Sequence, residues 1–315
     1  MRHRIAIVAL IFGISAALTG CKRLVEPENQ SISVYSSFWP VYALTDAVMD
    51  DVPDAELHVM AQPQDGCLRD YQISDWDAAM LANADAIIIG GRGLEGFESA
   101  LFSLEENGPA VSAVLYNLEL YNQDKPADSE SESHLDGANP HLYMSIDGAR
   151  EIIDSVAATM QSLDPSYAQK YIQNAQNAGD RLDQLLSENR ALLKDCAGRR
   201  VVLMNEALIY AANDYGLEVA DWIDRESGEA LYGNELSQLL ERLESADAKV
   251  ILIEKQAPQA LTDALADAGY AVARLDVFSA HREGEGFETY VEQQSANAQA
   301  ILGAFAQAGS TEVMN

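Results

Sequence analysis

Basic residues and cysteines are scarce in this chain of 315 residues. It has 20 lysines and arginines against 50 aspartates and glutamates, which gives a formal net charge of −30 at pH 7. A surface this acidic repels nucleic acid and anionic lipid, so we expect neither as a partner. The three cysteines form no Cys-x-x-Cys pair, which argues against a thiolate-rich zinc site.

The motifs of common enzyme classes are also missing. There is no Gly-x-Ser-x-Gly of the serine hydrolases, and the run Gly90–Gly93, "GGRG", lacks the Lys-Ser/Thr of a phosphate-binding loop. We interpret that run as a turn between a strand and a helix. The five histidines leave few candidate general bases. We therefore expect a binding protein and not an enzyme.

A targeting segment is predicted over residues 1–20. Two arginines precede an apolar run that is too short to cross a bilayer as a helix but has the length of a secretory core segment. The run ends in "LTGC", which resembles the lipobox of bacterial lipoproteins, so we expect a lipid on Cys21 and a tether over residues 21–30. The protein is then expected at the outer face of the cytoplasmic membrane. Whether Cys67 and Cys196 pair there stays open.

Two series of short apolar runs alternate with amphipathic stretches, a pattern typical of parallel sheets covered by helices. The first, over residues 31–145, predicts strands at 32–36, 55–60, 86–90 and 111–115 and helices at 41–49, 75–84 and 94–104. The second, over residues 197–315, predicts strands at 201–204, 217–222, 250–254 and 271–275 and helices at 206–215, 234–245, 259–268 and 288–305. Residues 146–196 have few helix breakers apart from Asp164-Pro165, and we predict one or two long helices there that link the lobes. The acidic stretch 122–138 predicts a solvated loop.

The carboxyl ends of the predicted strands are the expected ligand sites. Ligands of open α/β sheets bind just beyond these ends, and two facing lobes would bring them to one cleft. The stretches at these positions are 36–39, 66–70, 90–93, 205–206, 254–256 and Asp276.

Six stretches of the sequence carry a further signal. They are "VYSSFWPVYALTDAV" (34–48), "GCLRDYQISDWDAAMLANADAIIIGGRGLEGF" (66–97), "NPHLYMSIDGA" (139–149), "MNEALIYAANDYGLEV" (204–219), "VILIEKQ" (250–256) and "ARLDVFS" (273–279). In order and spacing, these stretches resemble the zinc- and manganese-type substrate-binding proteins of bacterial ABC importers. The resemblance implies two α/β lobes joined by a long helix, with Zn²⁺ or Mn²⁺ as cargo in the cleft. It also implies a membrane permease and a cytoplasmic ATPase as partners. We expect a monomer.

The family takes its metal ligands from four motifs, two in each lobe. The resemblance implies His141, from an intact Asn-Pro-His motif, and Asp276, at the end of the last strand. In the third motif Asn205 stands where relatives carry histidine or glutamate, with Glu206 beside it; an amide oxygen is a weak ligand for zinc. His134 lies in the acidic loop, where relatives carry a metal-gathering segment, although a lone histidine among carboxylates also fits a solvated loop.

Arg69 occupies the histidine position of the first motif. A guanidinium has no lone pair and does not deprotonate, and at ~4 Å from a divalent ion it would oppose binding by about 8 kcal/mol at an effective dielectric near 20. Three outcomes stay open: Arg69 turns away toward Asp70 or Asp75, pairs with Asp276 or Glu206 in place of a metal, or binds an anionic solute. The rival functions are a binding protein for an anionic solute and a structural or interaction lipoprotein that kept the fold without its cargo.

Overall fold

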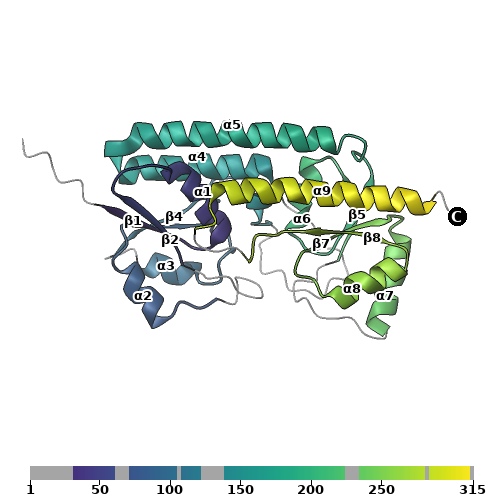
Figure 1. Ribbon diagram of the computed structural model, residues 1–315. Helices are drawn as coiled ribbons and strands as arrows, with labels where there is room; N and C mark the ends of the chain where they lie inside the picture. Colours follow the sequence, from purple (N-terminus) through teal and green to yellow (C-terminus); the bar gives the residue numbers. More distant parts are fainter. Residues whose placement is uncertain are drawn as a thin grey trace, which may run out of the picture. The chain divides into compact units, whose positions relative to one another are not determined.

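The computed structural model describes residues 31–60, 71–104, 108–121, 138–223, 234–280 and 284–312. The predicted signal peptide, the tether with Cys21 and nearly all of the acidic loop lie outside these ranges. Within them the chain forms two parallel sheets with helices on their faces (Figure 1), so the predicted α/β fold with two lobes is confirmed. None of the described helices has the length and apolar character needed to span a membrane.

The first lobe contains a parallel sheet with the strand order β2-β1-β3-β4. Its strands are β1 (Ile32–Ser36), β2 (Ala55–Val59), β3 (Ala86–Ile89) and β4 (Ala110–Ala113), and its helices are α1 (Trp39–Met49), α2 (Asp75–Leu81) and α3 (Glu98–Leu104). The run "AIII" of β3 is fully buried, as expected for a strand covered on both faces. Each predicted strand of this lobe is found within two residues of its expected ends.

The second lobe repeats this topology with the strand order β6-β5-β7-β8. Its strands are β5 (Arg200–Leu203), β6 (Glu218–Trp222), β7 (Val250–Glu254) and β8 (Ala271–Leu275), and its helices are α6 (Leu208–Asp214), α7 (Asn234–Ser245), α8 (Gln259–Asp267) and α9 (Phe287–Glu312). In both sheets the direction of winding reverses beside the first strand. The carboxyl ends of β1 and β3, and of β5 and β7, are therefore the switch points where ligands of such sheets bind.

Two helices occupy the region predicted to link the lobes. Helix α4 covers Ile146–Leu163, and a short 3₁₀ turn over Pro165–Tyr167 leads into α5, Ala168–Leu192. Proline is favoured at such a helix start because its missing N–H needs no partner there. Helix α5 packs against α4, against α1 of the first lobe and against α9 of the second, and so joins the lobes. Cys196 follows it as a buried free thiol, whereas Cys67 lies outside the described residues.

Helix α1 of the first lobe holds the start of α9. The Tyr42 hydroxyl accepts a hydrogen bond from the Gly284 amide at 3.1 Å, and Asp46 Oδ2 accepts one from the Phe287 amide at 3.0 Å. Asp46 thus caps α9 from another helix, where a carboxylate also complements the helix dipole. Burial raises the pKa of Asp46 above its ordinary value. A side chain at Gly286 would collide with this carboxylate, so the close approach requires glycine.

Asp214, the last residue of α6, caps the start of α4. Its carboxylate accepts hydrogen bonds from the Ser145 hydroxyl at 2.8 Å and from the Ile146 amide at 2.6 Å. Burial is the main cause that raises the pKa of Asp214 from 3.8 to about 6, and the two hydrogen bonds oppose it. The carboxyl group therefore holds a proton more tightly in the folded protein than in the unfolded chain.

We predict that Asp214 makes the protein less stable as the pH rises from about 4 to about 6. A raised pKa stabilises the fold fully below the unfolded pKa, and this contribution is lost as the pH passes the folded pKa. The shift corresponds to at most about 3 kcal/mol. Urea unfolding of wild type and Asp214→Asn across this range measures it: the wild-type free energy of unfolding should fall more steeply than that of the variant. Parallel curves would contradict the prediction.

Candidate metal centre

His141 lies at the start of a 3₁₀ turn, Leu142–Met144, directly after Asn139-Pro140. Oδ1 of Asn139 contacts the His141 amide nitrogen at 3.0 Å and His141 Nδ1 at 2.8 Å, and Asn139 Nδ2 donates to the Glu206 carbonyl at 2.9 Å. A backbone N–H can only donate and a carbonyl can only accept, so the orientation of the Asn139 amide is fixed. His141 Nδ1 must therefore carry the hydrogen, and the lone pair of the neutral ring lies on Nε2.

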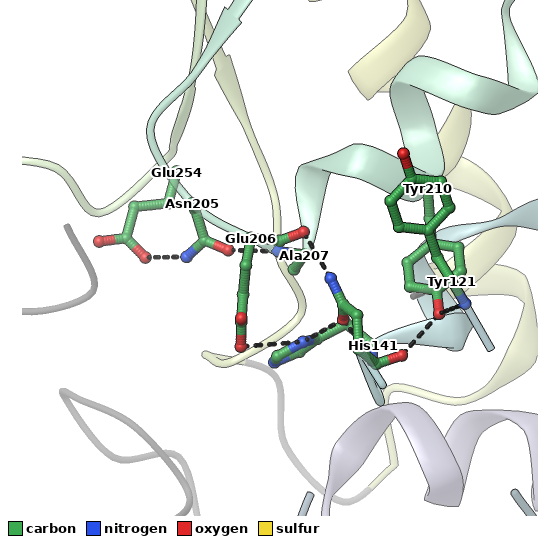
Figure 2. Close-up of polar contacts among 8 residues, drawn as sticks. Tyr121, His141, Asn205, Glu206, Ala207, Tyr210 and Glu254 are labelled. Atoms are coloured by element: carbon green, nitrogen blue, oxygen red, sulfur yellow. Dashed lines mark hydrogen bonds and ion pairs between the residues drawn. The ribbon is translucent and has the colours of Figure 1, made fainter. Parts of the chain in front are cut away.

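Two tyrosines hold Asn139 in place. The Tyr210 hydroxyl donates to the Asn139 carbonyl at 2.6 Å and accepts from the Tyr121 amide at 3.1 Å. The backbone N–H of Asn139 in turn donates to the Tyr121 carbonyl at 2.9 Å. A buried polar network thus orients the histidine, with Tyr121 from the segment after β4 and Tyr210 from α6 (Figure 2). Such support of the distal ring nitrogen is what metal-binding histidines require.

Glu206 places its carboxylate beside the imidazole. Its Oε1 lies 3.6 Å from His141 Nδ1, and the two side chains are only 5% and 14% exposed. A buried carboxylate next to an imidazole is costly to keep unless a partner offsets its charge. Glu206, from the third motif in the second lobe, thus lies in contact with His141, from the second motif.

Asn205 points in a different direction from Glu206 (Figure 2). Its Oδ1 accepts the Ala207 amide at 2.9 Å, and its Nδ2 lies 3.4 Å from Glu254 Oε2 at the end of β7. The Asn205 oxygen serves the backbone at the start of α6, which is why that helix begins two residues later than predicted.

Asp276 is a buried carboxylate at the end of β8, with 4% of its surface exposed. Asn297 of α9 accepts from the Asp276 amide at 2.8 Å and donates to its carbonyl at 3.0 Å. Asp276 Oδ1 accepts from the Phe278 amide at 2.7 Å, and Oδ2 lies 3.6 Å from Lys255 Nζ. Backbone and side chain are both held, so the carboxylate has a fixed direction.

Phe278, two residues beyond Asp276, has a strained backbone with φ 65°. Positive φ is unfavourable for a bulky residue and persists only where its surroundings enforce it. Here the ring is fully buried, with centroids 5.0 Å from Tyr290 and 5.7 Å from Trp39. Aromatic packing and the Asp276 hydrogen bond together maintain this turn beside the candidate site.

Glu95 braces the corresponding edge of the first lobe. This fully buried carboxylate accepts from the Ser37 hydroxyl at 2.6 Å and from the amides of Gly90 and Gly91 at 2.7 and 2.8 Å. Burial raises the pKa of Glu95, against the effect of these hydrogen bonds. The predicted turn at Gly90–Gly93 is confirmed, and Glu95 ties it to the end of β1.

The predicted ligand positions are only partly brought together. His141 and Glu206 are in contact, whereas Asp276 pairs with Lys255 and Asn205 with Glu254. In the part of the chain that the structure describes, no three His, Cys, Asp or Glu side chains converge closely enough to hold a metal ion. Three of the predicted site residues lie outside the described ranges: Cys21, Arg69 and His134.

Residues 34–304 match the profile of the zinc-uptake complex component A, periplasmic (ZnuA), family. The chain belongs to this family. Its resemblance to zinc- and manganese-type substrate-binding proteins is thereby confirmed. ZnuA-family proteins are extracytoplasmic solute-binding transport proteins.

Three relatives illustrate the match of this ZnuA-family chain. The high-affinity zinc uptake system protein ZnuA of Bacillus subtilis is 22% identical over 273 residues, 82% of this chain and 83% of that protein. The substrate-binding protein FpvC of Pseudomonas aeruginosa in complex with Mn²⁺ superimposes with a TM-score of 0.73 at 21% identity over 89% of this chain and 100% of that one. The Zn(II)-bound ZnuA-like domain of Streptococcus pneumoniae AdcA superimposes with a TM-score of 0.72 at 20% identity, over 87% of this chain and 98% of that one.

Glu254 and Lys255 are site residues to which the sequence assigned no role. Glu254 ends β7 and Lys255 follows it, so both are among the strand-end positions expected to line a ligand site. Their partners, Asn205 and Asp276, come from the two neighbouring strands, β5 and β8. The available signal was the strand order, because side chains at the ends of adjacent parallel strands meet.

Proposed function

We propose that this protein binds a divalent metal ion, zinc or manganese, and delivers it to the permease of an ABC importer. His141 Nε2 and the carboxylates of Glu206 and Asp276 are the proposed donors, and Asp276, which pairs with Lys255 in this structure, is proposed to join the other two when the metal binds. Membership of the ZnuA family supports transport of a metal, and the B. subtilis and S. pneumoniae relatives are named for zinc.

The orientation of His141 carries this proposal. Its Nδ1–H is committed to Asn139 Oδ1 at 2.8 Å, which leaves the metal-binding lone pair on Nε2. Imidazole nitrogen together with carboxylate oxygen suits Zn²⁺ and, with more oxygen donors, Mn²⁺. The buried Glu206 carboxylate, 3.6 Å from Nδ1 of the same imidazole, supplies negative charge beside the ring, and a nearby divalent cation would offset the cost of burying it.

Asn205 is proposed as a positioning residue for this site. Its side-chain oxygen is used by the Ala207 amide at 2.9 Å, so it fixes the start of α6 and the direction of Glu206. An amide oxygen would in any case add little affinity for zinc.

Attachment to the membrane is proposed to occur through a lipid on Cys21, with the two lobes held at the outer face of the cytoplasmic membrane. The permease and the ATPase that energises it are the proposed partners. A lipid anchor keeps the binding protein close to the permease, which raises the local concentration of loaded protein.

The test is a direct measurement of metal affinity. The soluble form, without residues 1–21, is purified without chelator, analysed for bound metal and titrated with ZnCl₂ and MnCl₂ by calorimetry or against a competing chelator. We expect one site with a dissociation constant well below about 1 μM for zinc or manganese. If neither metal binds below about 1 μM, the proposed cargo is wrong.

A further inference from the structure

A lysine stands beside Asp276, one of the proposed metal donors. Lys255 is the first residue after β7, and its Nζ lies 3.6 Å from Asp276 Oδ2. The lysine side chain is 60% exposed and the aspartate 5%. An ammonium therefore reaches from solvent to a buried carboxylate at the end of the neighbouring strand.

The loop that carries Lys255 is held on both sides. Its amide donates to the Leu275 carbonyl at 2.6 Å, which extends the pairing of β7 with β8, and its carbonyl accepts from Arg274 Nη2 at 2.9 Å. Gln256 Nε2 adds a contact to Ser279 Oγ at 3.3 Å. The position of the lysine next to Asp276 is thus a property of the folded loop and not of a free side chain alone.

The carboxylate cannot easily turn away from this lysine. Asp276 Oδ1 is engaged by the Phe278 amide at 2.7 Å, and Asn297 holds the Asp276 backbone from both sides. Oδ2 is the oxygen that faces Lys255. A metal ion bound at this oxygen would meet the ammonium at short range.

We propose that Lys255 is a charge placeholder at Asp276, which pairs with the carboxylate in the metal-free protein and is displaced when a divalent cation binds. This inference rests on the proposed function. Because a cation of charge +2 and an ammonium repel each other at one carboxylate, Lys255 lowers metal affinity and favours release. Lys255 is a positioning residue in this account and contributes no ligand atom.

The exposure of the Lys255 side chain to solvent limits how strongly its ammonium can weaken metal binding. Two charges about 5 Å apart at a solvent-exposed position interact weakly compared with a buried pair, since water and salt screen them. Removing the ammonium is therefore expected to tighten Zn²⁺ binding by about tenfold at low salt, and raising the salt concentration to 1 M should largely abolish this gain.

The experiment compares four soluble proteins by zinc competition titration at low and high salt: wild type, Lys255→Met, Lys255→Arg and Lys249→Met. Methionine keeps the length of the lysine stem without its charge, and arginine keeps the charge. Lys249 lies at the opposite end of β7, where its Nζ stands 5.2 Å from the Tyr270 ring, so Lys249→Met makes the same change in net charge far from Asp276. The melting temperature of each metal-free protein provides a second readout.

We expect tighter, salt-dependent binding in Lys255→Met, unchanged affinity in Lys255→Arg and Lys249→Met, and a slightly lower melting temperature for metal-free Lys255→Met. Equal affinity of Lys255→Met and wild type, with zinc bound by both, overturns the inference and leaves the proposed function standing. A gain that persists at 1 M salt, or that Lys249→Met shares, also overturns it. If none of the four proteins binds zinc or manganese, the proposed function fails and the inference with it.

Discussion

Replacing His141 by alanine is expected to weaken zinc binding by about 100-fold or more. Structural zinc sites, which have four ligands, are worth about 10–16 kcal/mol, so one ligand of such a site accounts for about 3 kcal/mol, which is about a factor of 100. His141 Nε2 carries the lone pair of a ring whose orientation Asn139 fixes. Competition titration of the soluble protein with a zinc-binding dye measures the loss.

His58→Ala is the matched control for this variant. His58 lies on β2, where its Nε2 stands 3.7 Å from Glu56 Oε2 and its side chain is 34% exposed. The His58→Ala substitution removes one imidazole from a strand that does not carry the candidate site, so zinc affinity should stay within about twofold of wild type. Equal affinities of His141→Ala and His58→Ala would show that His141 is not a ligand.

Gly148→Ala is expected to destabilise the protein by about 2–3 kcal/mol and to lower its melting temperature by about 5–10 °C. Gly148 is buried in the first turn of α4, and a Cβ there would lie 2.6 Å from the Leu142 carbonyl oxygen. Backbone cannot move aside as a side chain can, so the 3₁₀ turn would have to shift. Because that turn follows His141 directly, the variant should also bind zinc more weakly.

Gly303→Ala supplies the opposite expectation in the same measurement. Gly303 is exposed within α9, and among the described residues no atom outside the neighbouring helix backbone lies within 4 Å of a Cβ added there. Alanine favours a helix over glycine by about 0.5–1 kcal/mol, so the melting temperature should rise and zinc affinity stay unchanged. Similar losses of stability in both variants would contradict the clash assigned to Gly148.

The secondary structure and topology were largely predictable because apolar periodicity follows burial directly. The fully apolar β3, the apolar run Val250–Ile253 of β7 and the alternation of strands with amphipathic helices determined both sheets. The starts of α3 and α6 were misplaced by two to four residues, since Glu95 and Asn205 use their side chains to hold backbone amides ahead of each helix. Such side-chain caps compete with the helix and leave little trace in periodicity.

The candidate site was predictable only in part. His141, Glu206 and Asp276 could be identified from motif positions, but the direction of each side chain depends on partners distant in sequence. Glu206 meets His141 across a sequence separation of 65 positions, and Asp276 meets Lys255 at the end of the neighbouring strand. Arg69, which occupies the histidine position of the first motif, lies outside the described residues.

The protonation pattern of His141 tests the central claim most directly. Long-range ¹H–¹⁵N correlation spectra of the soluble protein, with His141 assigned from the spectrum of His141→Ala, separate the two ring nitrogens before and after one equivalent of Zn²⁺. The account predicts a hydrogen on Nδ1 in the metal-free protein and a large change at Nε2 when zinc binds. A hydrogen on Nε2 in the metal-free protein, or an unchanged His141 ring at full zinc occupancy, would contradict it.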